Sequence, residues 1–195
     1  MGAGVVLSVI IATRDSERLL VPTLAALVPG ATAGLISEVV IVDGGSRDDT
    51  AEVADIAGCR FLAVDGPQGR RLKAGAAAAR APRLLFLSPG TVLDAQWVAE
   101  VGRFAGGYSP AAHTDQAAVF RRGIGAQPAL REAFLLVCMA LGAGPRPEQG
   151  LIITKQFYDA LGGHREDVAD PEGDLLGRIG RRRILTLPAR AFSIG

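Results

Sequence analysis

Short runs of consecutive apolar residues alternate with amphipathic stretches through the first half of the chain. Such runs are typical of strands buried on both faces of a parallel sheet. Four occur, at 5–12, 39–42, 60–64 and 84–87. Between them apolar residues recur at helical spacing, in the stretches 19–28, 46–57, 70–81 and 94–104. This β–α alternation predicts a three-layer α/β/α sandwich around a mainly parallel sheet.

Proline, glycine and serine set the expected ends of these helices. Pro22 should kink the first helix or mark the start of its regular part, and Pro29 with Gly30 should end it. Ser46 is placed to cap the second helix, with two aspartates in its first turn. Pro82 should follow the end of the third helix.

The second half of the chain is less regular. It predicts strands at 117–121, 151–154 and 184–187 and helices at 128–141 and 155–161, with helical residues again after an acidic segment at 167–174. We find no internal repeat and no low-complexity linker. The 195 residues suffice for one domain with a good core and are short for two. We therefore expect a single domain, 1–195.

The composition of the chain narrows the classes of partner that we expect. The chain has 21 basic and 20 acidic residues, so no broad positive electrostatic field favours a nucleic acid partner. No apolar run reaches the roughly 18–20 residues that cross a bilayer, and the first residues lack the basic start of a signal peptide. Alanine, glycine and arginine are abundant, which by association resembles high-GC bacterial proteins.

Cysteine and histidine are scarce. Cys59 and Cys138 lie far apart in apolar contexts, which predicts buried free thiols in a reducing compartment and hence a cytoplasmic protein. Only two histidines occur, His113 and His164, so a histidine-based zinc site is not expected. We expect both histidines to lie on the surface, in loops.

The segment 39–50, VVIVDGGSRDDT, is the one around which the rest is organised. Its strand ends in Asp43, and two glycines turn the chain there. Open α/β sheets bind ligands outside the carboxyl ends of their strands, so Asp43 is a candidate ligand-binding acid. The alternative is that its carboxylate only caps the turn.

Two common nucleotide-binding motifs are missing. A dinucleotide-binding fold needs G-x-G-x-x-G directly after its first strand, where this chain has Ala12-Thr13-Arg14-Asp15. The phosphate-binding sequence G-x-x-x-x-G-K-[ST] is also absent. A nucleotidyltransferase would need a glycine-rich loop at the same first position, so that class ranks last.

A set of motifs in a fixed order resembles the family 2 glycosyltransferases, most closely a compact bacterial branch with the glycosyltransferase A-type (nucleotide-diphospho-sugar transferase) fold. In the first half the resemblance is carried by 8–13, 39–46 with Asp49-Thr50, 69–77 and 84–87. In the second half it is carried by 148–153, 157–163 and 171–175. The resemblance implies that 1–104 is a nucleotide-binding half and 105–195 an acceptor half.

The resemblance implies a nucleotide diphosphate sugar, first of all a UDP-sugar, as donor. Asp43 would then contact the nucleobase, with Thr13 and Asp15 lining the same pocket. The basic residues that would face the diphosphate are Arg70, Arg71 and Lys73. Guanidinium groups do suit phosphate oxygens. The alternative is that these three form only the solvated start of a helix.

The expected metal site departs from the family pattern. There, a carboxylate after the fourth strand holds Mg²⁺ or Mn²⁺ against the diphosphate, whereas this chain has Ser88-Pro89-Gly90. Asp94 is the next acid, a helix cap first and a metal ligand second. Three alternatives remain: phosphate and water hold the cation, the basic residues replace it, or activity has been lost.

The catalytic base is also altered. An inverting transferase needs a carboxylate that takes the proton of the acceptor hydroxyl, and the family's Glu-Asp motif falls on Pro171-Glu172. Glu172 is the candidate base, with Asp174 and Asp170 in reserve; the alternative is a solvated acidic loop that caps the next helix. Arg181–Arg183 would contact the acceptor or an anionic membrane surface, or form a solvated turn.

We therefore expect a glycosyltransferase of the hexosyltransferase type, which transfers a sugar with inversion from a nucleotide diphosphate sugar. The alternative is a catalytically degenerate protein of the same fold that binds a nucleotide or a partner.

Overall fold

The computed structural model of the protein describes residues 7–106, 115–123 and 145–194. The strands are β1 (Leu7–Thr13), β2 (Ile36–Asp43), β3 (Arg60–Ala63), β4 (Arg83–Leu87), β5 (Thr91–Leu93), β6 (Ala117–Arg122), β7 (Leu151–Thr154) and β8 (Ile184–Ser193). The α-helices are α1 (Glu17–Thr32), α2 (Thr50–Ile56), α3 (Gln68–Ala78), α4 (Trp97–Gly106), α6 (Lys155–Ala160) and α7 (Pro171–Ile179). Short 3₁₀ turns cover Pro147–Gln149 and Arg181–Arg183.

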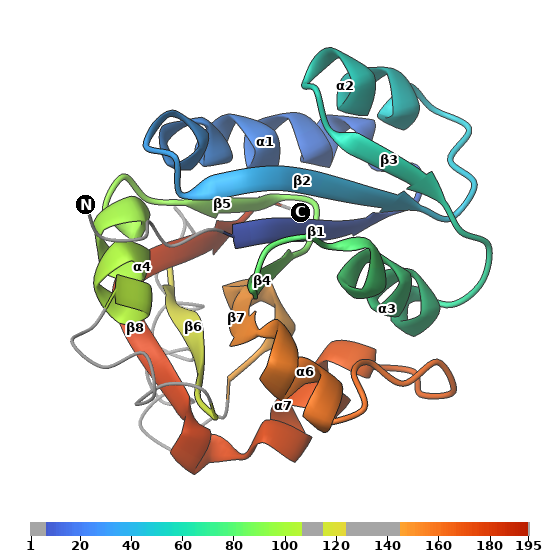
Figure 1. Ribbon diagram of the computed structural model, residues 1–195. Helices are drawn as coiled ribbons and strands as arrows, with labels where there is room; N and C mark the ends of the chain where they lie inside the picture. The colour runs from blue at the N-terminus through green and yellow to red at the C-terminus, as the bar shows by residue number, and fades with distance from the viewer. Residues whose placement is uncertain (1–6, 107–114, 124–144, 195) are drawn as a thin grey trace, which may run out of the picture.

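Within these described ranges the strands form one eight-stranded sheet in the order β3-β2-β1-β4-β7-β6-β8-β5 (Figure 1). The strands β3, β2, β1 and β4 are all parallel. β7 runs antiparallel to both β4 and β6, whereas β8 is parallel to β6 and antiparallel to β5. The predicted α/β fold with a mainly parallel sheet is confirmed.

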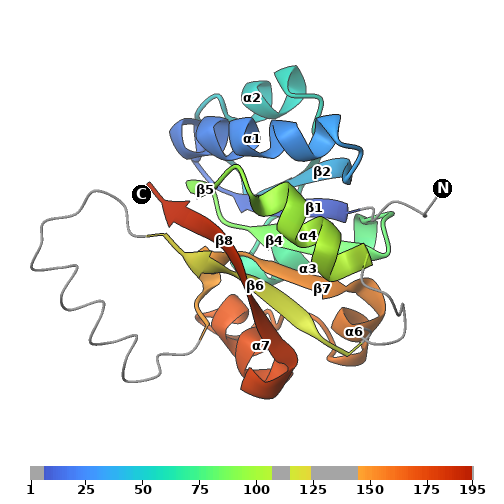
Figure 2. The same cartoon turned by 90° about the vertical axis from the view of Figure 1, so that its left-hand side faces the viewer.

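Two apolar cores lie on opposite faces of the sheet, because successive side chains of a strand point to opposite faces. In β1, Val9 and Ile11 join the core beneath α1, α2 and α4, while Ile10 joins the core beneath α3, α6 and α7. Figure 2 shows α1 and α2 on one side of the sheet and α6 and α7 on the other. These are the three predicted layers.

The first helix corrects one prediction. α1 runs through both prolines to Thr32 instead of ending at Pro29. The reason is tertiary packing at Gly30, where a Cβ atom would lie 2.2 Å from Trp97 of α4. The Trp97 indole also donates a 3.0 Å hydrogen bond to the carbonyl of Ala26. The ring of Trp97 thus holds the last turns of α1 in place despite the missing N–H of Pro29.

Other boundaries shift for similar reasons. α2 begins at Thr50, not at Ser46, and α4 begins at Trp97, not at Asp94. β5 was not predicted, and β8 extends to Ser193 rather than ending at Leu187. β5 is three residues long and exists through its pairing with β8, so no local pattern reveals it. The predicted helix at 128–141, His113 and Cys138 lie outside the described residues.

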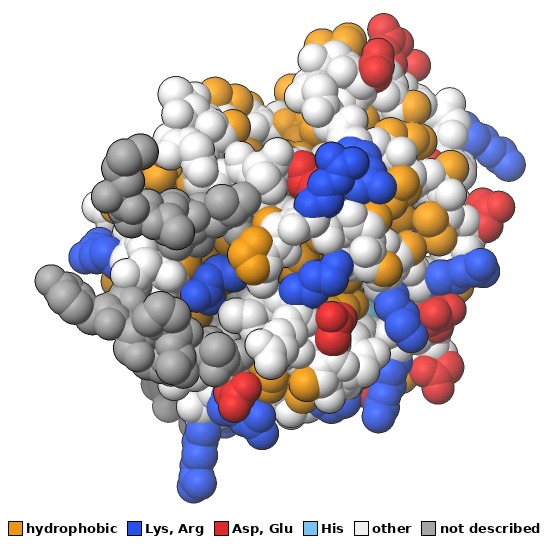
Figure 3. All heavy atoms as spheres, viewed as in Figure 1, with side chains coloured by type: hydrophobic (Ala, Val, Ile, Leu, Met, Phe, Trp, Pro, Cys, Tyr) orange, Lys and Arg blue, Asp and Glu red, His pale blue; other side chains and the backbone are white. Residues whose placement is uncertain are grey.

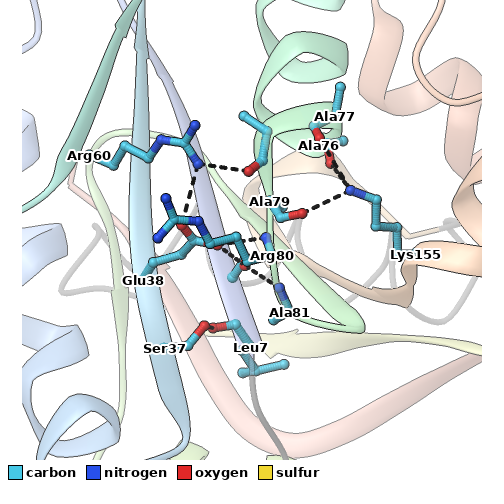
Figure 4. Close-up of polar contacts among 12 residues, drawn as sticks. Leu7, Ser37, Glu38, Arg60, Ala76, Ala77, Ala79, Arg80, Ala81 and Lys155 are labelled. Carbon is cyan, nitrogen blue, oxygen red and sulfur yellow. Dashed lines mark hydrogen bonds and ion pairs between the residues drawn. The ribbon is translucent and has the colours of Figure 1, made fainter.

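Side chains at the amino end of the parallel strands join separate parts of the fold. Lys155, the first residue of α6, donates hydrogen bonds to the carbonyls of Ala76, Ala77 and Ala79 at the end of α3 (Figure 4). The carboxylate of Glu38 in β2 accepts hydrogen bonds from Ser8 and from the backbone of Arg80. Lys155 supplies the cationic cap that free carbonyls at a helix end favour.

The small residues of α3 pack closely on the sheet. A Cβ atom at Gly75 would lie 2.6 Å from Ile10 and 2.9 Å from Val42.

Among the described residues, no helix has the length and apolar character that crossing a lipid bilayer requires.

Candidate functional site

At the carboxyl ends of β1 and β2 lies a carboxylate, that of Asp43, whose hydrogen-bond acceptor sites are all occupied. Asp43 is 4% exposed. One carboxylate oxygen accepts hydrogen bonds from the hydroxyls of Thr13 (2.9 Å) and Ser46, and the other from the backbone N–H groups of Gly45 (2.9 Å) and Ser46 (2.7 Å). Four acceptor sites are the full capacity of a carboxylate.

These bonds also set the ionisation of Asp43. Burial would raise the pKa of Asp43, but the hydrogen bonds from Ser46, Thr13 and Gly45 outweigh burial and hold that pKa below its usual value. The alternative interpretation, in which Asp43 caps the turn, therefore describes its contacts in this structure. Contact with a nucleobase stays a prediction.

The loop after β1 is fastened to the loop after β2. Asp15 has a φ of 46°, uncommon for a residue with a side chain. Its N–H donates to the hydroxyl of Ser46 (2.8 Å), and its carboxylate accepts from the N–H of Arg47 (2.8 Å). Ser46 therefore joins the two loops instead of capping α2, which corrects its predicted role. Thr13, Asp15 and Asp43 lie together in these two loops; that they line a nucleoside pocket stays a prediction.

The three basic residues of α3 have different surroundings. Arg70 and Lys73 are exposed. Arg71 is partly buried, and its guanidinium donates a 2.6 Å hydrogen bond to the carbonyl of Thr13. Arg71 thus supports the loop after β1, while Arg70 and Lys73 are open to a ligand. Figure 3 shows basic and acidic side chains intermixed along the edge where these strands end, without a single-sign patch.

The loop after β4 is tied to α1. The N–H of Gly90 donates to the carbonyl of Leu19 (3.0 Å) and the hydroxyl of Thr23 (2.9 Å). The carboxylate of Asp94 accepts from the N–H groups of Gln96 (3.0 Å) and Arg190 (2.8 Å), so it joins α4 to β8.

These residues do not fit a divalent cation of the expected kind. Mg²⁺ and Mn²⁺ favour carboxylate oxygens, and Ser88-Pro89-Gly90 supplies none. Within the described ranges, no three His, Cys, Asp or Glu side chains gather as a metal site.

Glu172 is the acid with an unusual environment. It is the second residue of α7 and partly buried, and it accepts a 3.0 Å hydrogen bond from Gln68, the first residue of α3. Burial raises the pKa of Glu172 to about 7, and the charge of Asp170 adds to this, whereas the bond from Gln68 opposes it. Glu172 is therefore poised between its two protonation states near neutral pH.

The reserve acids have structural partners. Asp174 pairs with Arg178 (2.7 Å) and Arg165 (3.3 Å). Asp170 accepts a 2.8 Å hydrogen bond from the N–H of Gly173 and so caps α7, as the alternative interpretation predicted. Catalysis by Asp174 stays a prediction to which these ion pairs add no support.

His164 corrects the prediction of a surface residue, because it is fully buried. Its ring Nδ1 lies 2.9 Å from the hydroxyl of Tyr158, and its backbone N–H donates to the same oxygen (3.0 Å). Burial, with the charge of Arg178, lowers the pKa of His164 to about 3. The ring edge packs against Phe86 with centroids 4.8 Å apart.

Two further predictions concern single residues. Arg181–Arg183 are exposed in a 3₁₀ turn, with the guanidinium of Arg183 5.5 Å from the ring of Phe157. This matches the solvated-turn alternative, and membrane contact stays an untested prediction. Cys59 is a partly buried free thiol, and burial raises its pKa to about 11.

Sequence reasoning missed Gln68, Ser46 and His164 as members of the site. Gln68 directly follows Pro67, a pattern that could have indicated that the helix begins there and not at Arg70. The glycines at 162 and 163 indicate a turn, but nothing local shows that this turn folds His164 back onto Tyr158.

Comparisons with known proteins give a fold. No protein-family model and no curated protein matches the sequence. Glucosyl-3-phosphoglycerate synthase from Mycobacterium tuberculosis, solved with phosphoglyceric acid, superposes with a TM-score of 0.69 at 18% identity, over 99% of this chain and 73% of its own. The chain has the glycosyltransferase A-type fold. A TarS fragment from S. aureus gives a TM-score of 0.68 at 16% identity, over 96% of this chain and 60% of that fragment.

The A-type fold gives the positions of the site residues a common frame. The chain spans about three quarters of the synthase and 60% of the TarS fragment. Other structures of the synthase contain Mn²⁺ with UDP or with UDP-glucose. At identities of 15–20% the likeness is one of fold, so activity and ligands are considered separately below.

Proposed function

We propose that the protein transfers a sugar, with inversion, from a nucleotide diphosphate sugar to an acceptor hydroxyl, with Glu172 as the general base. The observation that carries the proposal is the environment of Glu172. A carboxylate whose pKa is raised to about 7 accepts a hydrogen bond from the helix that bears the candidate diphosphate-binding residues. Bases with a pKa near the working pH are the most effective in proton transfer.

The step proposed for Glu172 is a single displacement. The acceptor oxygen attacks the anomeric carbon of the sugar while the bond from that carbon to the diphosphate oxygen breaks. The nucleotide diphosphate leaves with the bonding electron pair, and the ionised Glu172 takes the proton of the acceptor hydroxyl. Gln68 would keep the carboxylate oriented through its 3.0 Å hydrogen bond.

The donor would lie across the carboxyl ends of β1, β2 and β3. Thr13, Asp15 and Asp43 are the candidate nucleoside-binding residues. Asp43 would have to exchange one of its present hydrogen bonds for one from the nucleobase. UDP-sugars are the first donors to test, since the synthase of the same fold binds UDP and UDP-glucose.

The diphosphate would be balanced by Arg70 and Lys73, with Arg71 supporting the loop after β1. A metal is not assigned to this chain, because Ser88-Pro89-Gly90 offers no carboxylate. We therefore expect donor binding that depends little on Mn²⁺ or Mg²⁺, although a structure of the synthase contains Mn²⁺ with UDP.

The second candidate function is nucleotide binding without catalysis, in a degenerate member of the fold. The same loop favours it, because Gly90 is bonded to α1 and the loop provides no metal-binding group.

One experiment separates the two functions. UDP and other nucleoside diphosphates are titrated by calorimetry with and without Mn²⁺, and transfer and hydrolysis of labelled UDP-sugars are followed for wild type and Glu172→Gln. Glu166→Gln, at a neighbouring exposed acid, is the matched control. Turnover that falls by about 10²-fold or more in Glu172→Gln alone supports transfer.

The remaining outcomes of this experiment also distinguish between the two functions. Nucleotide binding without turnover in wild type would support the second function. No binding of any nucleotide at millimolar concentration would exclude both.

A further inference from the structure

His164 is brought into the core by a tight turn. Gly162 and Gly163 follow α6 with φ values of 80° and 68°, and a Cβ atom at Gly163 would lie 2.9 Å from the ring of Tyr158. A side chain at Gly163 would therefore be both strained and in collision with Tyr158. The turn returns the chain so that His164 contacts the hydroxyl of Tyr158 twice.

These two contacts fix the position of the ring proton. The Tyr158 hydroxyl accepts the backbone N–H of His164 (3.0 Å), and its own proton needs an acceptor. Within the described residues, the contact that provides one is Nδ1 of His164, 2.9 Å away. Nδ1 is then the acceptor, so the neutral ring carries its proton on Nε2. Burial raises the pKa of Tyr158 to about 12, so its hydroxyl keeps this proton.

His164 lines the same small space as Glu172, and the atom of its ring that needs a partner is Nε2. It is buried and has no hydrogen-bond partner among the described residues. A cavity of about 10 Å³, measured as the space open to the centre of a water molecule, is lined by both His164 and Glu172. The remaining wall comes from Phe86, Arg146, Pro147, Gly150, Leu151 and Leu176. This volume is at the lower limit of what one water molecule needs.

We propose that the Nε2–H of His164 holds a water molecule in this cavity and that the water donates a hydrogen bond to the carboxylate of Glu172. His164 is then a positioning residue, which acts through the water on the proposed base. Buried donors are rarely left unpaired, and buried waters typically bridge such groups. The inference rests on the proposed function only where it gives Glu172 a role in catalysis.

The charges around Glu172 agree with a need for such a donor. Asp170 and Glu148 both raise its pKa, and the hydrogen bond from Gln68 is the contact that favours the ionised form. Arg146 lines the cavity as well. A second donor, delivered through water, would help to keep the carboxylate ionised and oriented.

The first test uses the wild-type protein without ligand. Nitrogen-15 NMR of the histidine ring gives its tautomer, and magnetisation transfer from water shows whether a long-lived water contacts the Nε2 proton. We expect the Nε2–H tautomer and a water contact. A proton on Nδ1, or an Nε2 proton without contact to water, would overturn the proposal, and neither result depends on a variant that folds.

The second test follows the ionisation of Glu172 through its carboxyl carbon-13 shift. In His164→Phe we expect the pKa of Glu172 to rise by roughly 0.5 to 1 pH unit, because the donor that favours the ionised form is lost. Phe157→Leu, a buried change on the same helix as Tyr158, is the control for general loosening and should leave that pKa unchanged. Equal pKa values in wild type and His164→Phe would refute a water-mediated link.

These readouts are separate from the transfer assay. If transfer is found, His164→Phe should lower kcat and leave the KM for the nucleotide diphosphate sugar unchanged. If no transfer is found but the NMR results hold, the proposed function fails and the positioning of Glu172 stands.

Discussion

Asp43 and Glu172 both lie near the carboxyl ends of the parallel strands, yet the protein surrounds them in opposite ways. Asp43 accepts four hydrogen bonds and its pKa is lowered. Glu172 accepts one from Gln68 and has a pKa raised to about 7. The number of donors around a buried acid thus separates an acid that holds a turn from one that can exchange a proton.

The largest difference between the two acids is expected when the same substitution, acid to amide, is made at each. Asp43→Asn places an amide where two donors now point, so we expect the free energy of unfolding to fall by about 2 to 3 kcal/mol. Glu172→Gln removes a partly buried charge and should leave stability at pH 7 unchanged or raise it. Urea unfolding of both variants checks this. Equal losses at the two positions would contradict the distinction.

The pH dependence of stability should differ in sign between the two acids. The folded pKa of Glu172 is about 7 against 4.5 unfolded, so the folded state binds more protons between these values. Its contribution is complete below pH 4.5 and is lost as the pH rises through about 7, by about 2 kcal/mol after allowance for its partial exposure.

Asp43 behaves in the opposite way. Its folded pKa lies below 3.8, so its contribution is present above pH 3.8 and is lost as the pH falls through the folded pKa. Unfolding curves from pH 3 to 8 for wild type and Glu172→Gln separate the two acids. If the fall in stability between pH 4.5 and 7 persists in Glu172→Gln, another group causes it.

A smaller effect is expected at the partner of Asp43. Thr13→Val keeps the shape of the side chain but removes the hydroxyl that donates to Asp43 (2.9 Å). We expect a loss of about 1 kcal/mol in the free energy of unfolding. Thr32→Val, at an exposed helix end, is the matched control and should change stability by less than half as much.

The smallest effects on stability belong to the basic residues of α3. Arg70→Ala and Lys73→Ala should leave the free energy of unfolding within about 0.5 kcal/mol, since both side chains are exposed. Calorimetry should show UDP binding weakened by roughly threefold to tenfold. Arg71→Ala should instead lower stability, because it removes the bond to the Thr13 carbonyl. Weaker UDP binding in Arg71→Ala alone would reverse these roles.

Local pattern predicted the fold well and the site in part. β1, β2 and β4 each contain a run of at least three consecutive apolar residues, and these runs alone identified the three strands. The passage of α1 through Pro29 depends on Trp97, and β5 depends on a strand about a hundred residues later. Such long-range contacts leave no local signal.

The same reason explains the errors in the site. Glu172 was predicted from its place in a motif, whereas its raised pKa arises from burial and from Asp170, which spacing alone does not reveal. His164 has a polar neighbourhood in sequence, with Arg165 and Glu166 directly after it. Its burial follows from the glycine turn and from the partner it meets there, Tyr158.

The place of β8 in the sheet has a consequence for how the chain folds during synthesis. β8 lies between β6 and β5, and among the described residues β5 pairs with β8 alone. Residues 91–93 therefore stay unpaired on the ribosome until residues 184–193 have emerged, whereas β1 to β4 can already assemble. The parallel half can thus form early, and closure of the sheet at β5 waits for a late-made strand.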